Sequence, residues 1–377
     1  MTVLRVIVDD MVNPAARGVG VYTEELAREL IRTAPPGCSV DAIVSASPET
    51  DYEYIEQRLP GLGQLFKSTL ARRELTAAWQ HGFTKLPGDG MIHATSLLAP
   101  LSKHDRLNNP GDQIAVTVHD VIAWTQPESL TSRQVSWHKA MLKRAHKYAD
   151  AVVVPTHSVV EQLADILDFG DRLRVIGGAA SSKLVRPVDA DERAARLGLP
   201  EHFVLTLGKL DSRRGIEHVL RALGLPDAPQ LPLVLVGNDD SDEVKHAASA
   251  AGLDGDRVLN LGFVSDADYA VVLERATVFV LPSIEEGFGL PLIEAFTFGT
   301  PVVHSDVPAL TEVAADAGIV VQREDVADYP ARLAAAVSAV VNDAALAERL
   351  HFQGLDRSKA FSWRASAEKV WQLHADL

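Results

Sequence analysis

The feature of this sequence that most constrains its fold is the alternation of short apolar runs with segments of helical pattern along almost the whole chain. Strands that alternate with helices favour parallel sheets covered by helices on both faces, which is an α/β fold. Strands are expected at residues 3–9, 40–44, 91–94, 114–118, 151–154, 203–207, 233–236, 258–261, 276–281, 301–304 and 319–321.

The length of the chain, 377 residues, favours two domains, since single hydrophobic cores stop growing near ~250–300 residues. Residues 176–187 are rich in Gly, Ala and Ser, which suits a mobile crossover between domains. We therefore expect Rossmann-like, doubly wound domains at residues 1–180 and 181–362. Ser362 is a suitable N-cap for a final helix over residues 363–377.

Residues 283–299, SIEEGFGLPLIEAFTFG, directly follow one of the expected strands. Gly287 and Gly289 predict a tight loop that a ligand can approach closely. Pro291 suits the first turn of a helix, and Gly299 suits its end. A strand, a glycine loop and a helix in this order place free amides and the positive end of the helix dipole together, which makes an anion site.

Two acids flank this loop, Glu286 and Glu294, with seven residues between them. We expect Glu294 in the first helical turn, where its carboxylate can bond both hydroxyls of a ribose whose diphosphate occupies the amides. An acid at this place can also do no more than complement the helix dipole.

Composition excludes several classes of function. The net charge of −15 argues against a nucleic-acid partner, which needs a broad basic surface. Cys38 is the single cysteine, so the chain can form no internal disulfide. The first residues have no signal-peptide pattern, and no apolar run approaches the ~18 residues of a membrane span. The expected location is cytoplasmic.

A second glycine-rich stretch follows the first expected strand. Gly18 and Gly20 form a G-x-G pattern in an expected loop, but Thr23 stands where a dinucleotide-binding fingerprint has its third glycine. The second strand also lacks the terminal acid of that fingerprint. A nicotinamide-dependent dehydrogenase therefore remains an alternative with an incomplete motif, and a simple strand-to-helix turn is another.

Polar side chains follow two further strands. His119 comes just after residues 114–118, at the carboxyl end of a strand, where open α/β sheets place their ligands. Lys209, Arg213 and Arg214 follow Gly208 after another strand. Such cations stabilise the charge that develops on a diphosphate leaving group.

The string S-x-x-E-G-F-G-L-P-L-I-E-A-x-x-x-G-x-P-V-V, from Ser283 to Val303, resembles the signature of the retaining glycosyltransferase family 4. Members of that family have the GT-B fold, in which two Rossmann-like domains face a cleft and the last helix crosses back onto the first domain. The resemblance implies transfer of a hexosyl unit, with mannosyl from GDP-mannose as the first expectation. The donor is then a nucleoside diphosphate sugar, and the acceptor is a hydroxyl of a glycan or a lipid-linked molecule.

The resemblance also implies roles for individual residues. Glu294 would bind the ribose, Glu286 the donor sugar, and Lys209 and Arg214 the diphosphate, with Arg213 as a possible substitute. His119 and the amides of Phe288, Gly289 and Leu290 would contact the sugar. Gly18, Gly20 and Gly208 would lie near the phosphates. Gly237 and Phe263 would lie at the nucleobase.

One departure from the family pattern is an exchange of cations. Lys209 stands where the family usually has arginine, and Arg214 where it usually has lysine. Because a planar fork and a point charge are not equivalent, a non-catalytic sugar-nucleotide-binding protein is an alternative.

Two expectations concern other partners. No D-x-D motif stands at a strand end between the domains, so no metal ion and no cofactor are expected. Residues 138–147, HKAMLKRAHK, predict a helix with a basic face. This face is either simply solvated or contacts anionic lipid at the inner face of a membrane.

Overall fold

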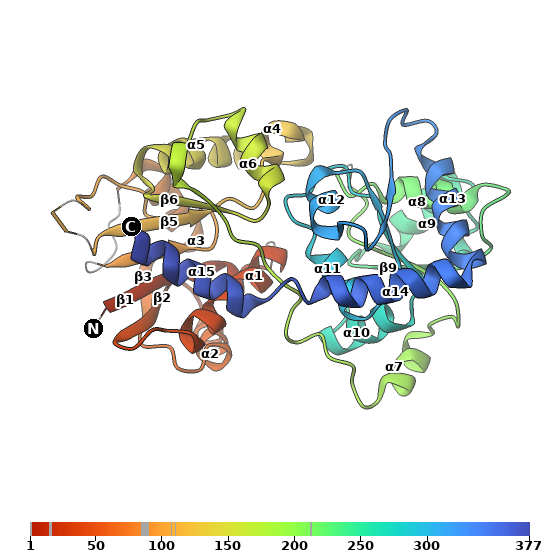
Figure 1. Cartoon of the computed structure of the whole chain (residues 1–377), viewed down its shortest axis with the longest axis horizontal. Helices are drawn as coiled ribbons and strands as arrows, with labels where there is room; N and C mark the ends of the chain where they lie inside the picture. Colours follow the sequence, from red (N-terminus) through yellow and green to blue (C-terminus); the bar gives the residue numbers. More distant parts are fainter. Residues whose placement is uncertain (1, 15–16, 84–89, 107, 110, 212) are drawn as a thin grey trace. The chain divides into compact units, whose positions relative to one another are not determined.

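The computed structural model describes residues 2–14, 17–83, 90–106, 108–109, 111–211 and 213–377. The chain divides into two compact units. Unit 1 comprises Met1–Gly178 and Ser362–Leu377, and unit 2 comprises Ala179–Phe361. Each unit is an α/β structure built around a parallel sheet, as the alternating pattern predicts (Figure 1).

In the described part of unit 1 the sheet has the strand order β3-β2-β1-β4-β5-β6-β7, and all of its pairings are parallel. The strands are β1 (Thr2–Ile7), β2 (Cys38–Ala46), β3 (Leu65–Ala71), β4 (Met91–Ala94), β5 (Gln113–Thr117), β6 (Ala151–Val154) and β7 (Leu173–Val175). The helices are α1 (Arg17–Arg32), α2 (Glu49–Arg58), α3 (Arg72–His81), α4 (Ile122–Thr125), α5 (Ser132–Tyr148), α6 (His157–Ala164) and α15 (Trp363–Asp376). Short 3-10 helices are η1 (Asp9–Val12), η2 (Pro127–Ser129) and η3 (Gly170–Arg172).

In the described part of unit 2 the strand order is β10-β9-β8-β11-β12-β13, again with parallel pairings. The strands are β8 (Val204–Leu207), β9 (Leu233–Val236), β10 (Val258–Asn260), β11 (Val278–Leu281), β12 (Val302–Ser305) and β13 (Ile319–Val321). The helices are α7 (Ala190–Leu197), α8 (Ile216–Gly224), α9 (Ser241–Ala250), α10 (Asp266–Arg275), α11 (Leu290–Thr297), α12 (Pro308–Ala314), α13 (Tyr329–Asn342) and α14 (Ala344–Ser358), with the 3-10 helix η4 (Gly255–Arg257).

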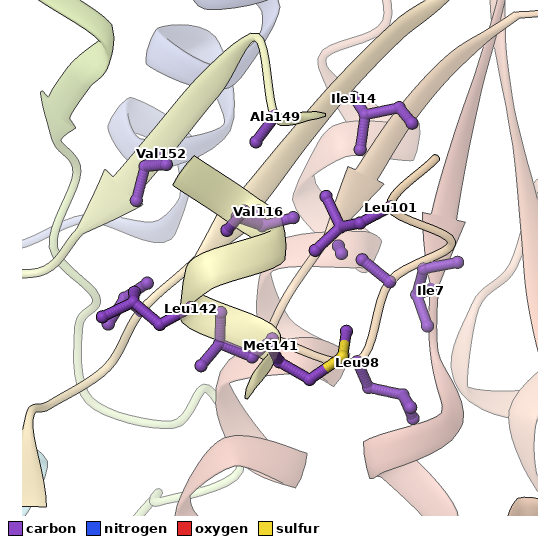
Figure 2. Packing of buried hydrophobic residues seen from close by; sticks show 14 of the residues in the cluster. Ile7, Leu98, Leu101, Ile114, Val116, Met141, Leu142, Ala149 and Val152 are labelled. Atoms are coloured by element: carbon purple, nitrogen blue, oxygen red, sulfur yellow. The ribbon is translucent and has the colours of Figure 1, made fainter. Parts of the chain in front are cut away.

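Helices cover both faces of each sheet, and strands such as β6 and β11 therefore consist of buried apolar residues. On one face of the unit 1 sheet, Met141 and Leu142 of α5 pack with Val116 of β5 and Val152 of β6 (Figure 2). In unit 2, α8, α9 and α13 contribute to one core cluster, and α10, α11 and α12 contribute to another. The loops at the carboxyl ends of the strands remain available for polar chemistry.

The last helix, α15, belongs to unit 1, as the GT-B resemblance implies. Ser362 caps it by accepting a hydrogen bond from the amide of Ala365. The indole of Trp371 donates to the carbonyl oxygen of Leu30 at 3.2 Å, and α15 lies beside α1 (Figure 1). The side chain of Trp363 occupies the place that a Cβ atom on Gly178 would need.

Several expected bounds are wrong. The first strand ends at Ile7 rather than at residue 9, because the chain turns into η1. Strands β3 and β7 were not predicted: β3 alternates half-buried with exposed residues, and β7 is only three residues long. At such edge positions there is no continuous apolar run to recognise.

A buried histidine pair joins α15 to the sheet. Nε2 of His374 lies 3.4 Å from Nδ1 of His93 on β4, and Nδ1 of His374 lies 3.0 Å from the amide oxygen of Gln113. Burial lowers the pKa of His93 to about 4 and holds the pKa of His374 well below its ordinary value. Both rings are therefore neutral in the folded protein at pH 7.

Acid should consequently destabilise unit 1. The unfolded chain binds protons at these histidines below pH 6.5 while the folded chain does not, so stability is complete above pH 6.5 and falls as the pH drops toward 4. For His93 alone, the free energy of unfolding should fall by about 2 kcal/mol between pH 7.5 and pH 5. Urea unfolding at the two pH values measures the loss, and His93→Gln should reduce it. An equal loss in the variant would contradict this assignment.

Candidate functional site

The glycine loop after β11 has the geometry that its sequence predicts. Gly289 has φ of +88°, a left-handed conformation, and a Cβ atom there would lie 2.4 Å from the side chain of Leu310. Helix α11 begins at Leu290 with Pro291 in its first turn, and no side chain caps its first turn. The first amides of α11 are thus not taken up by an N-cap side chain, and a helix start of this kind can bind an acceptor group of a ligand.

Glu286 is brought together with Arg214 at the start of this loop. Oε1 of the buried Glu286 accepts hydrogen bonds from the guanidinium of Arg214 and, at 3.0 Å, from the hydroxyl of Ser283. Gly208 has φ of +120°, and a Cβ atom there would lie 3.2 Å from Cγ of Arg214. Two loops that are distant in the sequence therefore meet at the carboxyl edge of the unit 2 sheet.

The other two predicted cations lie differently. Lys209 is exposed, and no ion pair of its ammonium group with a described residue occurs. Arg213 is half-buried, and its carbonyl oxygen accepts a hydrogen bond from the amide of Ile284 at 2.7 Å. Arg213 thus ties the loop after β8 to the loop after β11 through its backbone.

The residues expected at a nucleobase also meet at this edge. The amide of Gly237 donates to the carbonyl oxygen of Gly262 at 2.7 Å. A Cβ atom on Gly237 would lie 3.5 Å from the amide nitrogen of Gly208 and 3.8 Å from the ring of Phe263. Phe263 is 36% exposed, so its ring presents an apolar surface beside these backbones. Phe288 is half-buried, and its ring packs edge to face against that of Phe361, with the ring centroids 5.9 Å apart.

The position expected for Glu294, within the first helical turn, is wrong by about one residue. Because α11 begins at Leu290, Glu294 is its fifth residue and lies beyond the first turn. Its Oε2 atom accepts a hydrogen bond from the hydroxyl of Tyr269 at 3.1 Å. Burial raises the pKa of Glu294 to about 7, and the hydrogen bond from Tyr269 opposes that rise.

The expected loop at Gly18 and Gly20 is also wrong, because both glycines lie inside the first turn of α1. A Cβ atom on Gly20 would lie 2.8 Å from the carbonyl oxygen of Asp10, so glycine allows α1 to pack closely on η1. Outside its own helix, no atom of a described residue lies within 4 Å of a Cβ atom placed on Gly18. The amides of both residues therefore belong to a helix start, and the strand–loop geometry of a dinucleotide fingerprint is absent from this described stretch.

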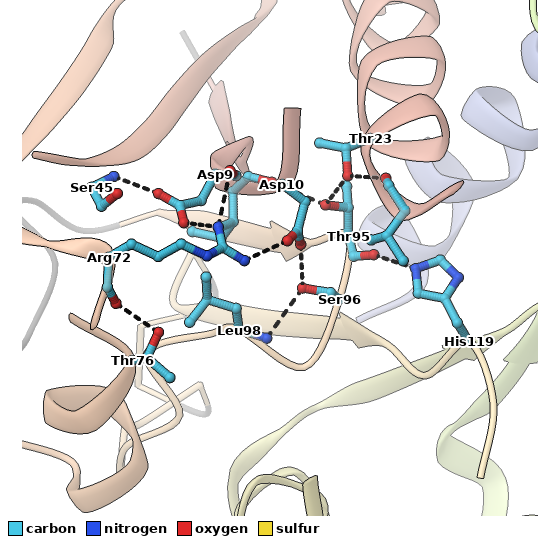
Figure 3. Close-up of polar contacts among 12 residues, drawn as sticks. Asp9, Asp10, Thr23, Ser45, Arg72, Thr76, Thr95, Ser96, Leu98 and His119 are labelled. Carbon is cyan, nitrogen blue, oxygen red and sulfur yellow. Dashed lines mark hydrogen bonds and ion pairs between the residues drawn. The ribbon is translucent and has the colours of Figure 1, made fainter. Parts of the chain in front are cut away.

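His119 lies at the carboxyl end of β5, as predicted. Its Nε2 atom lies 2.7 Å from the carbonyl oxygen of Thr95, so Nε2 carries the proton of the neutral ring (Figure 3). The imidazole ring packs edge to face against the ring of Tyr22, with the ring centroids 4.7 Å apart. Burial lowers the pKa of His119, and the Thr95 carbonyl and the charges of Asp120 and Asp10 oppose this. Nδ1 is consequently a hydrogen-bond acceptor at neutral pH.

Sequence reasoning missed a polar cluster next to His119. The guanidinium of Arg72 bonds the carboxylates of Asp9 and Asp10, and the hydroxyl of Ser96 donates to Oδ2 of Asp10 at 2.7 Å (Figure 3). The two acids come just after β1, with only Val8 between, so the rule that selected His119 also applies to them. Arg72 follows β3, which was not predicted, and no local signal marks it.

A cavity of about 540 Å³ opens beside this cluster within unit 1. Asp10, Arg72, Ser96 and His119 contribute to one part of its lining, and Trp137 of α5 contributes to another. Carboxylate, hydroxyl, imidazole and indole groups together suit a ligand with many hydroxyls and an apolar ring face.

Comparison with known proteins identifies the family. The model for glycosyl transferases group 1 matches residues 189–354, and the model for Glycosyltransferase Family 4 matches residues 16–179. The D-inositol 3-phosphate glycosyltransferase of Nocardioides sp. is 31% identical over an alignment of 405 positions, and the match covers 95% of this chain and 85% of that protein. The chain belongs to glycosyltransferase family 4.

This family 4 glycosyltransferase is also similar to two Escherichia coli proteins. O-antigen chain mannosyltransferase B is 28% identical over 260 residues, and the match covers 67% of each chain. The serotype-specific mannosyltransferase WbdA is 27% identical over 230 residues, and the match spans only 28% of its length. The family makes this chain a transferase enzyme and removes the dehydrogenase alternative.

Solved structures agree on the fold of this glycosyltransferase. Sucrose-phosphate synthase from Thermosynechococcus elongatus superposes over 100% of the chain and 99% of its own, with a TM-score of 0.73 and 23% identity. Anabaena HepE in complex with UDP-glucose has a TM-score of 0.72 at 17% identity, with full coverage of both chains. The predicted GT-B fold is confirmed.

Removing the cation of Arg72 should destabilise unit 1. Asp9 has no exposed side-chain surface, so Arg72→Leu leaves a buried carboxylate without its cationic partner. The free energy of unfolding should fall by about 2–4 kcal/mol, since breaking a buried pair leaves an uncompensated charge. Urea unfolding measures this change. The neighbouring Arg73 is exposed, and Arg73→Leu should change stability by less than about 0.5 kcal/mol; equal losses would refute the role of Arg72.

Proposed function

We propose that this enzyme transfers a hexosyl unit from a nucleoside diphosphate sugar to a hydroxyl of a glycan or lipid-linked acceptor, with retention at the anomeric carbon and without a metal ion. Mannosyl from GDP-mannose is the proposed donor group. The similarity to the E. coli proteins named mannosyltransferases supports the sugar. The structure of HepE with UDP-glucose supports a nucleotide-sugar donor for this fold in general.

The observation that carries this proposal is the Glu286–Arg214 ion pair in the loop that leads into α11, a helix whose N-cap, Gly289, has no capping side chain. In the proposed complex the diphosphate lies at the amide end of α11 and near Arg214, and the amides of residues 288–290 contact the transferred sugar. Lys209, whose side chain is exposed, supplies a second cation. The carboxylate of Glu286 accepts a hydrogen bond from a hydroxyl of the transferred sugar, while Arg214 and Ser283 keep this carboxylate oriented.

The chemistry proposed for these residues is attack on the same face from which the diphosphate departs. The bond between the anomeric carbon and the diphosphate oxygen breaks, and the acceptor oxygen forms the new bond. The acceptor proton moves to the departing phosphate oxygen. Arg214, Lys209 and the helix dipole stabilise the negative charge that accumulates there.

In unit 1, His119 is proposed to position the sugar and the cavity to bind the acceptor. Because the Nε2–H group of His119 donates a hydrogen bond to the carbonyl oxygen of Thr95, its Nδ1 atom can accept a hydrogen bond from a sugar hydroxyl. Asp10 is held by Arg72 and Ser96, so its carboxylate offers a fixed acceptor for hydroxyl groups in the cavity.

Metal independence has a direct test. Among the described residues, no group of three or more His, Cys, Asp and Glu side chains is placed to hold a metal ion. Transfer or donor hydrolysis should be measured with GDP-mannose, GDP-glucose, UDP-glucose and ADP-glucose, with and without EDTA. Turnover of a nucleotide sugar that survives EDTA supports the proposal. Nucleotide binding without any turnover would contradict it.

Glu294 should contribute to nucleotide affinity in particular. Glu294→Gln removes the charge that strengthens hydrogen bonds from ribose hydroxyls, so GDP should bind about 10–100-fold more weakly by calorimetry. Glu243, an exposed acid at the start of α9, offers the control variant Glu243→Gln, which should leave the affinity unchanged. Unchanged affinity in Glu294→Gln would exclude this residue from the site.

Contact with a membrane surface is proposed for α5. The basic stretch is helical, as predicted, but the guanidinium of Arg144 is engaged by the carbonyl oxygen of Leu101. Lys143 and Lys147 are exposed, and Phe83 beyond the end of α3 is 83% exposed. No helix in the described ranges is long and apolar enough to cross a membrane.

Binding to lipid vesicles tests this contact. Vesicles with anionic phosphatidylglycerol should sediment the protein, and neutral phosphatidylcholine vesicles should not. The double variant Lys143→Glu/Lys147→Glu should lose this binding, since each basic residue near such a surface contributes about 1 kcal/mol. Lys245→Glu, on α9 of unit 2, is the control. Equal binding by the double variant, or none by the original protein, leaves α5 as a solvated face.

A further inference from the structure

Tyr269 is a residue near the proposed nucleotide site to which neither the sequence motif nor the proposed chemistry gives a role. It is the fourth residue of α10, whose start is fixed by Ser265 as N-cap. Its ring is half-buried and packs against the core cluster that α10, α11 and α12 share. Its hydroxyl leaves that cluster and reaches the carboxylate of Glu294 on α11.

This contact leaves the Glu294 carboxylate with one engaged oxygen and one available oxygen. Oε2 accepts a hydrogen bond from the hydroxyl of Tyr269 at 3.1 Å, whereas no described residue donates a hydrogen bond to Oε1. An ionised carboxylate has about four lone-pair sites, so one bond from a phenol leaves most of its capacity for a ligand. The bond also restricts rotation of the carboxylate, which reduces the entropy lost when a ligand binds.

The same hydrogen bond favours the charged form of the acid. Burial and the negative charge of Asp266 on α10 raise the pKa of Glu294, which reaches about 7, and the Tyr269 hydroxyl acts against both. The phenol itself keeps its proton, because burial and the charge of Glu294 hold its pKa well above the ordinary value. Tyr269 is therefore a donor throughout the neutral range.

We infer that Tyr269 is a positioning residue of the donor site: its hydroxyl holds one oxygen of Glu294 so that the carboxylate accepts hydrogen bonds from the ribose hydroxyls of the nucleoside diphosphate sugar. This inference rests on the proposed function, because it takes the ribose as the ligand of Glu294. A purely structural tyrosine, by contrast, would serve only as an apolar part of the core.

The test compares the full-length protein with Tyr269→Phe, which keeps the packing ring and removes only the hydroxyl. Calorimetric titration with GDP, UDP and ADP first identifies the nucleotide that binds. The variant should bind that nucleotide about three- to tenfold more weakly at pH 7, a loss typical of one ordinary hydrogen bond, because the bonds from the ribose to Glu294 are weakened but not removed. Its thermal unfolding should remain a single transition like that of the original protein.

The pH profile separates positioning from packing. Ribose binding needs the ionised carboxylate, so affinity falls as the pH drops through the pKa of Glu294. Without the Tyr269 hydroxyl that pKa rises further, and the fall in affinity should begin at a higher pH in Tyr269→Phe. A structural loss alone would weaken binding equally at every pH.

A double-mutant cycle and a deoxynucleotide complete the test. In the Glu294→Gln background, Tyr269→Phe should cause little additional loss, because the carboxylate that it positions is gone. The 2′-deoxy form of the bound nucleotide should bind the original protein about tenfold more weakly, and this ratio should shrink in Tyr269→Phe.

The outcomes distinguish this inference from the proposed function. If Glu294→Gln weakens nucleotide binding but Tyr269→Phe changes neither affinity nor pH profile, Tyr269 has no positioning role and the proposed function stands. Additive losses in the double variant would likewise exclude a positioning role for Tyr269. If none of the three nucleotides binds the original protein, the proposed function and this inference both fail.

Discussion

Both units of this glycosyltransferase depend on one constraint, the burial of both faces of a parallel sheet. Strands such as Ala151–Val154 and Val278–Leu281 have only buried residues, since helices pack on each side. A polar side chain buried within such a sheet needs a partner, as His93 has in His374, whereas the loops at the carboxyl ends can hold polar side chains that face a ligand. His119, Arg214 and Glu286 occupy such loops. The same packing that stabilises the two sheets thus determines where ligand chemistry can occur.

The polar groups at these edges are partly buried, and the structure satisfies them in pairs. Asp10 is held by Arg72 and Ser96, Glu286 by Arg214 and Ser283, and Glu294 by Tyr269. A buried carboxylate without such a partner would take up a proton or disfavour folding. Each partner also restricts the orientation of its acid, so the contacts that make burial tolerable prepare the acids to accept hydrogen bonds.

Much of the fold could be predicted from the sequence because hydrophobic periodicity and the Gly and Pro residues that mark turns and helix ends are local properties. The run around Pro291 predicted a strand, a glycine loop and a helix, and β11 and α11 follow that order. The predicted helix bounds were less accurate. Helix α11 starts earlier than expected, so Glu294 lies beyond its first turn, and α1 also starts earlier, so Gly18 lies within it. Arg72 and Tyr269 escaped prediction for another reason. Their partners are 62 and 25 residues away, and such pairings depend on strand order and helix packing.

The membership of α15 in unit 1 has a consequence for how the protein is made. Trp371 and His374 pack against residues from the first third of the chain, and they are synthesised 341 and 261 residues after their partners Leu30 and Gln113. Until they emerge from the ribosome, the face of the sheet beside α1 lacks its helical cover, and apolar surface there stays open to water and to other chains. Unit 2, by contrast, is complete as soon as Phe361 has left the exit tunnel. The second unit can therefore mature before the first, although its residues come later in the chain.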